Sequence, residues 1–121
     1  MVLILGGFAS GKRAFARSLG FRDEDMSADA FDGKPVLYGL ESIVRSDPDA
    51  AEALSKALLQ KKLVLCCEVG SGVVPLDPKD RAYREAVGRL CCKLAKEASA
   101  VVRVVAGIPT VIKGELVCTY D

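Results

Sequence analysis

The sequence contains no histidine, and its positive and negative charges nearly cancel. Without histidine, the chain lacks the side chain that most often serves as a general base near neutral pH. It also lacks the usual nitrogen nucleophile. The net charge is +1, from 17 basic and 16 acidic residues. This balance argues against a protein that coats a polyanion, so we expect no nucleic-acid partner.

Long apolar runs are also missing. No run approaches the roughly 18 apolar residues that a membrane span needs. The first residues do not combine a basic segment with a long apolar stretch, as a signal peptide does. We therefore expect no membrane span, no signal peptide and a cytoplasmic location. Half of the 121 residues are hydrophobic, which allows one domain over 1–121 with a substantial core.

Metal-binding cysteine patterns are absent as well. The five cysteines are Cys66, Cys67, Cys91, Cys92 and Cys118. They form two adjacent pairs and a single residue, which is not the spacing of a zinc site, and no histidine completes one. Adjacent cysteines rarely bridge each other, and a cytosolic chain keeps its thiols reduced. We interpret these residues as small buried hydrophobes.

Apolar runs and amphipathic segments alternate along the chain. Strands are predicted at 1–5, a continuously apolar run typical of a buried parallel strand, and in the mainly apolar stretches 63–69 and 100–107. Helices are predicted over 12–20, closed by Gly20, over 47–62, with Asp47 as N-cap and Pro48 first, and over 79–98. The stripe of the last helix comprises Tyr83, Val87, Leu90 and Leu94. This order predicts an α/β fold, an open and mainly parallel sheet with helices on both faces.

Three segments are less regular. Residues 21–35 are acidic and non-periodic, and we expect an exposed loop there. Residues 36–45 are ambiguous, because 36–38 suit a short strand while Leu40, Ile43 and Val44 have helical spacing. Residues 110–121 suit a short hairpin or an edge strand.

The stretch "GGFASGKR", residues 6–13, follows the first apolar run. It fits the phosphate-loop pattern G-x-x-x-x-G-K, with a predicted strand before it and a predicted helix after it. Backbone N–H groups of such a loop surround an anion, and Lys12 would reach the β- and γ-phosphates. The nucleotide-binding residues predicted here are Gly6, Gly7, Ser10, Gly11, Lys12 and Arg13.

Arg13 stands where the motif has Ser or Thr. The missing hydroxyl normally coordinates Mg²⁺, whereas a guanidinium only donates hydrogen bonds and repels a metal ion. Two roles remain open for Arg13: contact with phosphate, or exposure to solvent, which its position favours. ATP or GTP is the expected ligand, with Mg²⁺ doubtful.

Further candidates follow the second predicted strand. Glu68 lies at its end, where open α/β sheets bind ligands, and could hold a metal ion or orient a hydroxyl. Gly70, Ser71 and Gly72 come next and suit either a close ligand approach or an ordinary turn. Arg81 and Arg84 share one face of the following helix, which suits phosphate recognition or simple solvation.

Several stretches together resemble one family. They are "LILGGFASGK" (3–12), "EVGSGVVP" (68–75), "RAYREAVGRL" (81–90), "LA" (94–95) and "AGIPTVIK" (106–113). The chain is similar in these to the adenosylcobinamide kinase / adenosylcobinamide-phosphate guanylyltransferase family of cobalamin biosynthesis. The resemblance implies a P-loop protein that phosphorylates adenosylcobinamide with ATP or GTP and then transfers GMP through a guanylylated histidine. It also implies a homo-oligomer, such as a trimer.

The sequence departs from the family pattern at several points. The histidine-bearing middle segment is replaced, and its acidic metal-site motif has no clear counterpart. Arg13 replaces the loop serine, Cys67 replaces an asparagine, and Cys91–Cys92 replaces an Asn-Gln pair. Because no histidine exists, guanylyl transfer by the family route is excluded. Kinase chemistry depends mostly on positioning and charge, so it is less affected.

Two main hypotheses follow, and a third is weaker. The first is a shortened kinase in which Lys12 and Glu68 are catalytic, Glu68 is the metal ligand, and Arg81 and Arg84 contact phosphate. The second is a non-catalytic descendant that binds a nucleotide or a partner. The third, a small kinase for another alcohol or a nucleoside monophosphate, would need an arginine-rich lid that the sequence does not show.

Overall fold

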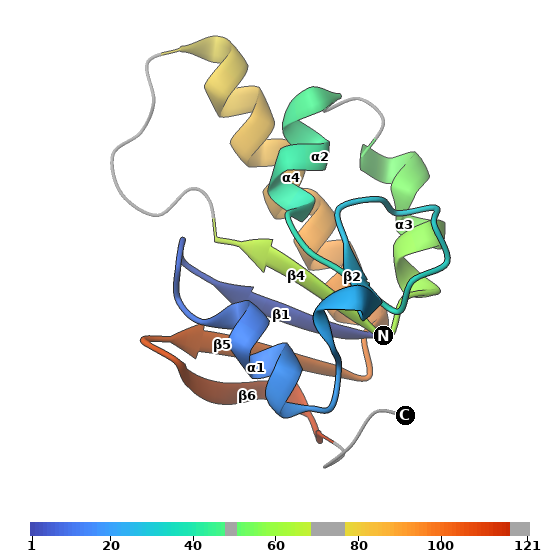
Figure 1. Cartoon of the computed structure of the whole chain (residues 1–121). Helices are drawn as coiled ribbons and strands as arrows, with labels where there is room; N and C mark the ends of the chain where they lie inside the picture. The colour runs from blue at the N-terminus through green and yellow to red at the C-terminus, as the bar shows by residue number, and fades with distance from the viewer. Residues whose placement is uncertain (48–50, 69–76, 117–121) are drawn as a thin grey trace.

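The computed structural model describes residues 1–47, 51–68 and 77–116 (Figure 1). The elements are β1 (Val2–Gly6), α1 (Lys12–Ser18), a 3₁₀ turn (Asp23–Asp25), β2 (Met26–Ser27), β3 (Val36–Leu37), α2 (Leu40–Ser46), α3 (Ala51–Leu59), β4 (Leu63–Cys67), α4 (Pro78–Glu97), β5 (Ala100–Val105) and β6 (Ile108–Gly114).

The strands form one six-stranded sheet in the order β2-β3-β4-β1-β5-β6. Every neighbouring pair from β2 to β5 is parallel, and β6 runs antiparallel to β5 at the edge. α1 covers one face, while α3 and α4 lie across the other (Figure 1). The predicted mainly parallel α/β sheet with helices on both faces is therefore confirmed.

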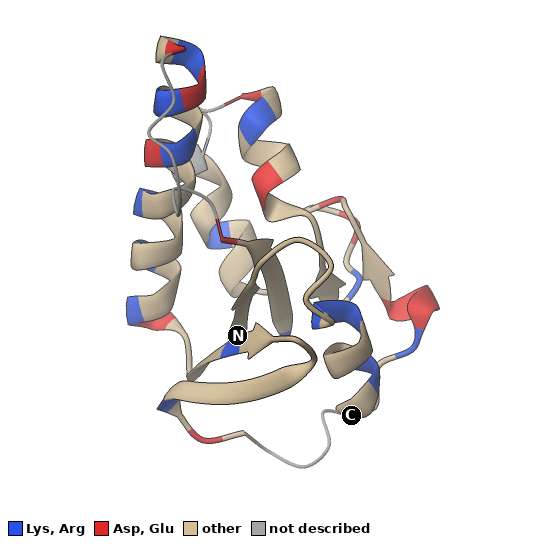
Figure 2. Cartoon of the chain, turned by 90° about the vertical axis from the view of Figure 1, so that its left-hand side faces the viewer, with Lys and Arg blue, Asp and Glu red and all other residues tan. Residues whose placement is uncertain are grey.

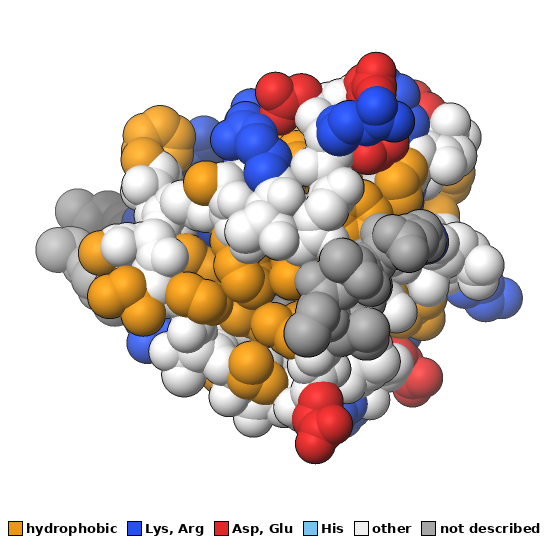
Figure 3. All heavy atoms as spheres, turned by 60° about the horizontal axis from the view of Figure 1, so that its bottom comes forward, with side chains coloured by type: hydrophobic (Ala, Val, Ile, Leu, Met, Phe, Trp, Pro, Cys, Tyr) orange, Lys and Arg blue, Asp and Glu red, His pale blue; other side chains and the backbone are white. Residues whose placement is uncertain are grey.

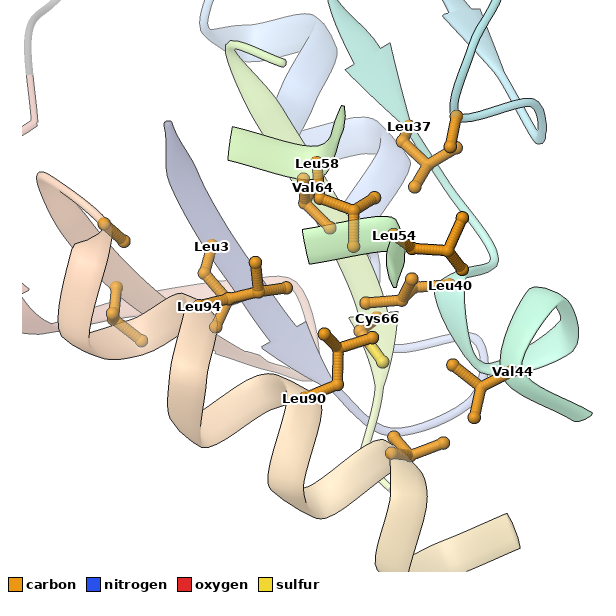
Figure 4. Close-up of a cluster of buried hydrophobic side chains, with 14 of the residues drawn as sticks. Leu3, Leu37, Leu40, Val44, Leu54, Leu58, Val64, Cys66, Leu90 and Leu94 are labelled. Carbon is orange, nitrogen blue, oxygen red and sulfur yellow. The ribbon is translucent and has the colours of Figure 1, made fainter. Parts of the chain in front are cut away.

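Alternate residues of each central strand face opposite layers. Leu3 and Val64 point toward α2, α3 and α4, where they pack with Leu90 and Leu94 (Figure 4). Ile4 belongs to the cluster on the other face, under α1. Because the strands are buried on both faces, their sequences are continuously apolar. Removing a fully buried leucine such as Leu94 is expected to cost about 2–5 kcal/mol.

The long helix matches its prediction closely. α4 begins at Pro78, and the side chain of Asp77 accepts a hydrogen bond from the backbone N–H of Lys79 at 2.9 Å. This cap and the proline at the first position fix the start of the helix. The residues of its predicted apolar stripe are all buried, namely Tyr83, Val87, Leu90 and Leu94. The outward side of α4 carries basic and acidic residues intermixed (Figure 2).

The prediction of an exposed loop over 21–35 is wrong in part. Phe21, Met26 and Ala30 are buried, and β2 pairs in parallel with β3. The acidic residues of the 3₁₀ turn remain outside the core. Because the buried positions have neither helical nor strand spacing, periodicity does not reveal them.

Both alternatives for 36–45 occur, one after the other. β3 ends at Leu37, Gly39 adopts the left-handed conformation with φ of 69°, and α2 begins at Leu40. Asp47 is the C-cap of α2, and the predicted helix start that follows it falls on residues 48–50, outside the described residues. The described part of the next helix, α3, begins at Ala51, and Pro48 lies outside the described residues.

β6 is an edge strand, one of the two alternatives predicted for the tail, and it forms a hairpin with β5. The turn is Ala106–Gly107, and both residues have positive φ, as a two-residue hairpin turn requires. Apolar side chains on and near β6 remain exposed, including Ile108, Val111 and Ile112. Figure 3 shows hydrophobic side chains gathered on the face that includes this strand. Among the described helices, none is long and apolar enough to cross a membrane.

Candidate functional site

The loop between β1 and α1 has the conformation of a phosphate loop. Ser10 N–H donates to Gly7 O at 3.2 Å, and Gly11 is left-handed with φ of 96°. Ala9 is also left-handed, with φ of 56°, a conformation that costs a non-glycine residue roughly 1–2 kcal/mol. Gly107 N–H donates to Ser10 O at 2.8 Å, so a backbone hydrogen bond joins the β5–β6 turn to the loop.

Two loop glycines are required by close neighbours. A Cβ atom at Gly6 would overlap Ser10 Oγ and would lie 2.6 Å from Val104 O. A Cβ at Gly11 would lie 3.1 Å from Gly107 Cα, in addition to the unfavourable φ. The loop is therefore packed against β5 and the hairpin turn at both of its glycine ends.

The side chain of Lys12 folds back onto the loop that precedes it. Its Nζ donates to Gly7 O at 2.7 Å, to Gly6 O at 3.3 Å and to Cys67 Sγ at 3.4 Å. None of these three hydrogen-bond partners is a carboxylate, so none of them neutralises the positive charge of Lys12. An anion entering the loop would offer Lys12 stronger, charge-assisted hydrogen bonds.

A cavity of about 760 Å³ opens in front of this loop. Its walls come from residues 8–14 and 17, from the β3–α2 connection and α2, and from the end of β4. Three cationic side chains line it, those of Lys12, Arg13 and Arg17. Glu41 carries the only carboxylate among the described residues that line it. This excess of positive charge favours an anionic ligand.

Arg13 does not simply point into solvent. Its Cζ lies 3.9 Å from the centroid of the Tyr38 ring, so the guanidinium stacks on the ring. Tyr38 directly follows β3 and lines the same cavity. Arg13 thus connects the start of α1 to the β3–α2 connection, a role that sequence reasoning missed.

Glu41, in the first turn of α2, was also missed. Its Oε2 accepts a hydrogen bond from the backbone N–H of Cys67 at 3.0 Å, which fixes the carboxylate beside the end of β4. Burial raises the pKa of the Cys67 thiol, and the nearby Glu41 charge raises it further, while Lys12 opposes both effects. A carboxylate soon after a parallel strand was the available signal, but the ambiguity of 36–45 hid it.

Glu68 has a different environment. Its backbone N–H donates to Gly6 O at 2.8 Å, so it lies beside the phosphate loop as predicted from its place after β4. Its carboxylate forms an ion pair with Arg103, with Nε to Oε1 at 2.8 Å. Glu68 is not among the residues that line the cavity.

The other residues predicted to bind nucleotide either do not line the cavity or lie outside the described residues. Arg81 and Arg84 are on α4, where Arg84 pairs with Asp80 at 3.6 Å, and neither lines the cavity. Gly70, Ser71 and Gly72 lie outside the described residues.

The sequence model of the cobinamide kinase / cobinamide phosphate guanyltransferase family matches residues 39–112, more than half of the chain. The chain belongs to this family. A search of curated proteins finds no match. Membership gives the chain a role related to cobalamin biosynthesis and nucleoside triphosphates as the substrate class.

The matched span of this cobinamide kinase family member includes Glu41, Glu68, Arg81 and Arg84 but begins after the phosphate loop. The loop is therefore recognised from its own pattern and geometry. The span also covers residues 39–67, which lie outside the stretches that carried the resemblance.

Mg²⁺, which phosphate loops usually hold through a hydroxyl next to the lysine, fits this family member poorly. Arg13 occupies the hydroxyl position with a cation, and Arg103 engages Glu68. Glu41 remains, already hydrogen-bonded to Cys67 N–H. Among the described residues, no group of three His, Cys, Asp or Glu side chains could hold a metal ion. Arg13 thus removes the protein hydroxyl that would join phosphate and water oxygens around Mg²⁺.

Proposed function

We propose that the cavity binds a nucleoside triphosphate and that the chain transfers its terminal phosphoryl group to a hydroxyl of adenosylcobinamide, without a guanylyl transfer step. The observation that carries this proposal is the phosphate loop with Lys12 at the mouth of a cavity lined by three cations. Family membership supplies the substrate class. The absence of histidine from the sequence supports leaving out the guanylylated intermediate.

In this proposal Lys12 Nζ gives up its hydrogen bond to Gly7 O and donates to phosphate oxygens instead. The loop amides and the side chains of Arg13 and Arg17 neutralise the rest of the phosphate charge. The acceptor oxygen forms a bond to the γ-phosphorus while the bond to the β–γ bridging oxygen breaks. The hydroxyl proton passes to a carboxylate, and Glu41 rather than Glu68 is our candidate for that group, because Glu41 lines the cavity.

A binding-only descendant is the second candidate function. It is favoured by Arg13 in place of a metal-ligating hydroxyl and by the engagement of Glu68 with Arg103. In this case the cavity would hold a nucleotide without turnover. Homo-oligomerisation and the binding of ATP or GTP stay predictions.

The test is transfer of labelled γ-phosphate from ATP and from GTP to adenosylcobinamide. The wild-type chain should form labelled product, and Lys12→Ala should abolish it. Product at the level of the Lys12→Ala control would exclude the kinase. Nucleotide binding without product would then favour the binding-only function.

A further inference from the structure

The contact between Arg13 and Tyr38 joins two parts of the cavity wall. Arg13 belongs to the first turn of α1, and Tyr38 lies between β3 and α2. The distance of 3.9 Å from the guanidinium carbon to the ring centroid is well within the range of a cation–π contact. Arg13 therefore has a defined position in the cavity even though its side chain is exposed.

Stacking uses the flat face of the guanidinium and leaves its edge free. The five N–H donors lie in the guanidinium plane, so a stacked arginine still offers hydrogen bonds to phosphate oxygens. Among the described residues, none forms an ion pair with Arg13, whereas Arg17 in the same cavity pairs with Asp23 at 2.7 Å. Arg13 thus brings a positive charge that no described carboxylate balances.

Arg13 stands at the sequence position where phosphate loops normally carry the Mg²⁺ ligand. In the phosphate-loop motif, the residue after the lysine holds Mg²⁺, which neutralises the β- and γ-phosphates. Here the same residue is itself a cation. A metal ion at that place would be repelled by the guanidinium and would lack its hydroxyl ligand.

We propose that Arg13, held in place by Tyr38, substitutes for the divalent cation, so that the cavity binds the metal-free form of a nucleoside triphosphate. This inference rests on the proposed function, since it concerns the nucleotide of the same site. Arg13 and Tyr38 are then the residues that determine which form of the nucleotide binds.

The test is calorimetric titration with ATP and with GTP, in EDTA and in Mg²⁺ at matched ionic strength. The variants are Arg13→Ser, which restores the motif, Tyr38→Leu, which removes the ring, and Tyr38→Phe, which keeps it. Arg89→Ser is the matched control, because it removes the same charge from an exposed site on α4 that does not line the cavity. Lys12→Ala reports on the nucleotide site itself.

The wild type should bind more tightly in EDTA than in Mg²⁺, by about threefold or more in Kd, because Mg²⁺ takes up the metal-free nucleotide that the cavity binds. Arg13→Ser should weaken binding in EDTA by about tenfold or more, the loss of at least one charged hydrogen bond. Mg²⁺ should restore part of that affinity. Tyr38→Leu should weaken binding by about threefold or more through loss of the stacking contact, and Tyr38→Phe, which keeps the ring, should lose less affinity than Tyr38→Leu. Arg89→Ser should bind as the wild type does.

Wild-type binding that is as tight in Mg²⁺ as in EDTA, or tighter, would overturn this inference while leaving the proposed function intact. Unchanged affinity of Arg13→Ser in EDTA would overturn it as well. If the wild type binds neither nucleotide under either condition, or if Lys12→Ala binds as well as the wild type, the proposed function itself fails.

Discussion

Arg103 and Glu68 form a two-contact ion pair, with Nε 2.8 Å from Oε1 and Nη2 3.1 Å from Oε2. Arg103 lies on β5 and Glu68 follows β4, and these two strands flank β1. The backbone N–H of Glu68 also donates to Gly6 O, the last residue of β1. The pair therefore links the two neighbours of β1 at the point where the phosphate loop begins, which gives Glu68 a structural role.

Replacing each carboxylate by its amide should separate the roles of Glu41 and Glu68. Glu41→Gln should lower phosphoryl transfer by about 10²-fold, the usual contribution of a positioned acid or base. Glu68→Gln should lower it less than about tenfold, because the amide still accepts hydrogen bonds from Arg103. Transfer rates measured at saturating nucleotide, with Glu85→Gln on α4 as control, test this. A larger loss in Glu68→Gln than in Glu41→Gln would restore Glu68 as the catalytic candidate.

Adding one methyl group should destabilise the chain at Gly6 but not at the adjacent Gly7. Gly6→Ala places a Cβ atom 2.6 Å from Val104 O, a backbone atom of a central strand, so the free energy of unfolding should fall by about 1–3 kcal/mol. Gly7→Ala meets nothing within 4 Å and should change it by less than about 0.5 kcal/mol. Urea unfolding of both variants measures the difference. Equal stability of the two would mean that the loop does not pack against β5 as described.

The stability of the chain should depend on pH through Asp32. Hydrogen bonds from Ser27, from the Lys34 backbone N–H and from Lys61 lower the pKa of the Asp32 carboxyl far below its ordinary value. Lys61 is itself buried, and its Nζ lies 3.0 Å from Asp32 Oδ1. Because the folded-state pKa is lowered, this stabilisation is fully present above the unfolded-state pKa of about 4 and is lost as the pH falls toward the folded-state value.

Thermal unfolding at several pH values between 2 and 7 should therefore show a smaller loss on acidification in Asp32→Asn than in the wild type. At pH 7, Asp32→Asn should be less stable, because the buried Lys61 loses its charged partner. Asp23→Asn, in an exposed ion pair with Arg17, is the control and should change stability by less than about 1 kcal/mol. An unchanged pH profile in Asp32→Asn would contradict this explanation.

The central strands and the long helix could be predicted because their signals are local. Mainly apolar runs predicted β1, β4 and β5. The buried face of α4 was predicted by the spacing of Tyr83, Val87, Leu90 and Leu94. The short elements could not be predicted in the same way. β2 and β3 have two residues each, too few to show a period, and exist through pairing with neighbours that come later in the chain.

The site was predictable only where it is contiguous. The loop carries its own pattern, so Gly6, Gly11 and Lys12 could be singled out from the sequence as candidates, and Gly11 and Lys12 line the cavity. Tyr38 and Glu41 enter the cavity because parallel pairing brings the end of β3 beside the end of β4. That juxtaposition depends on the strand order, which one sequence does not reveal.

Thiol labelling should report on the site without any assay of turnover. Cys92 is exposed, Cys66 is fully buried, and Cys67 lies between them in exposure and lines the cavity. Hydrogen bonding with Cys91 and burial raise the pKa of Cys66, so little thiolate forms there at pH 8. A pulse of N-ethylmaleimide followed by peptide mass spectrometry should therefore label Cys92 first, Cys67 more slowly and Cys66 last.

Nucleotide should slow the labelling of Cys67 alone. Bound phosphate would draw Lys12 Nζ away from Cys67 Sγ, now 3.4 Å distant, and would remove the cation that lowers the pKa of this thiol. The ligand would also cover the cavity wall. Cys92 serves as the internal control, and all three cysteines should react alike in guanidinium chloride. Protection of Cys67 in the wild type that persists in Lys12→Ala would show that coverage alone, without movement of Lys12, accounts for the effect.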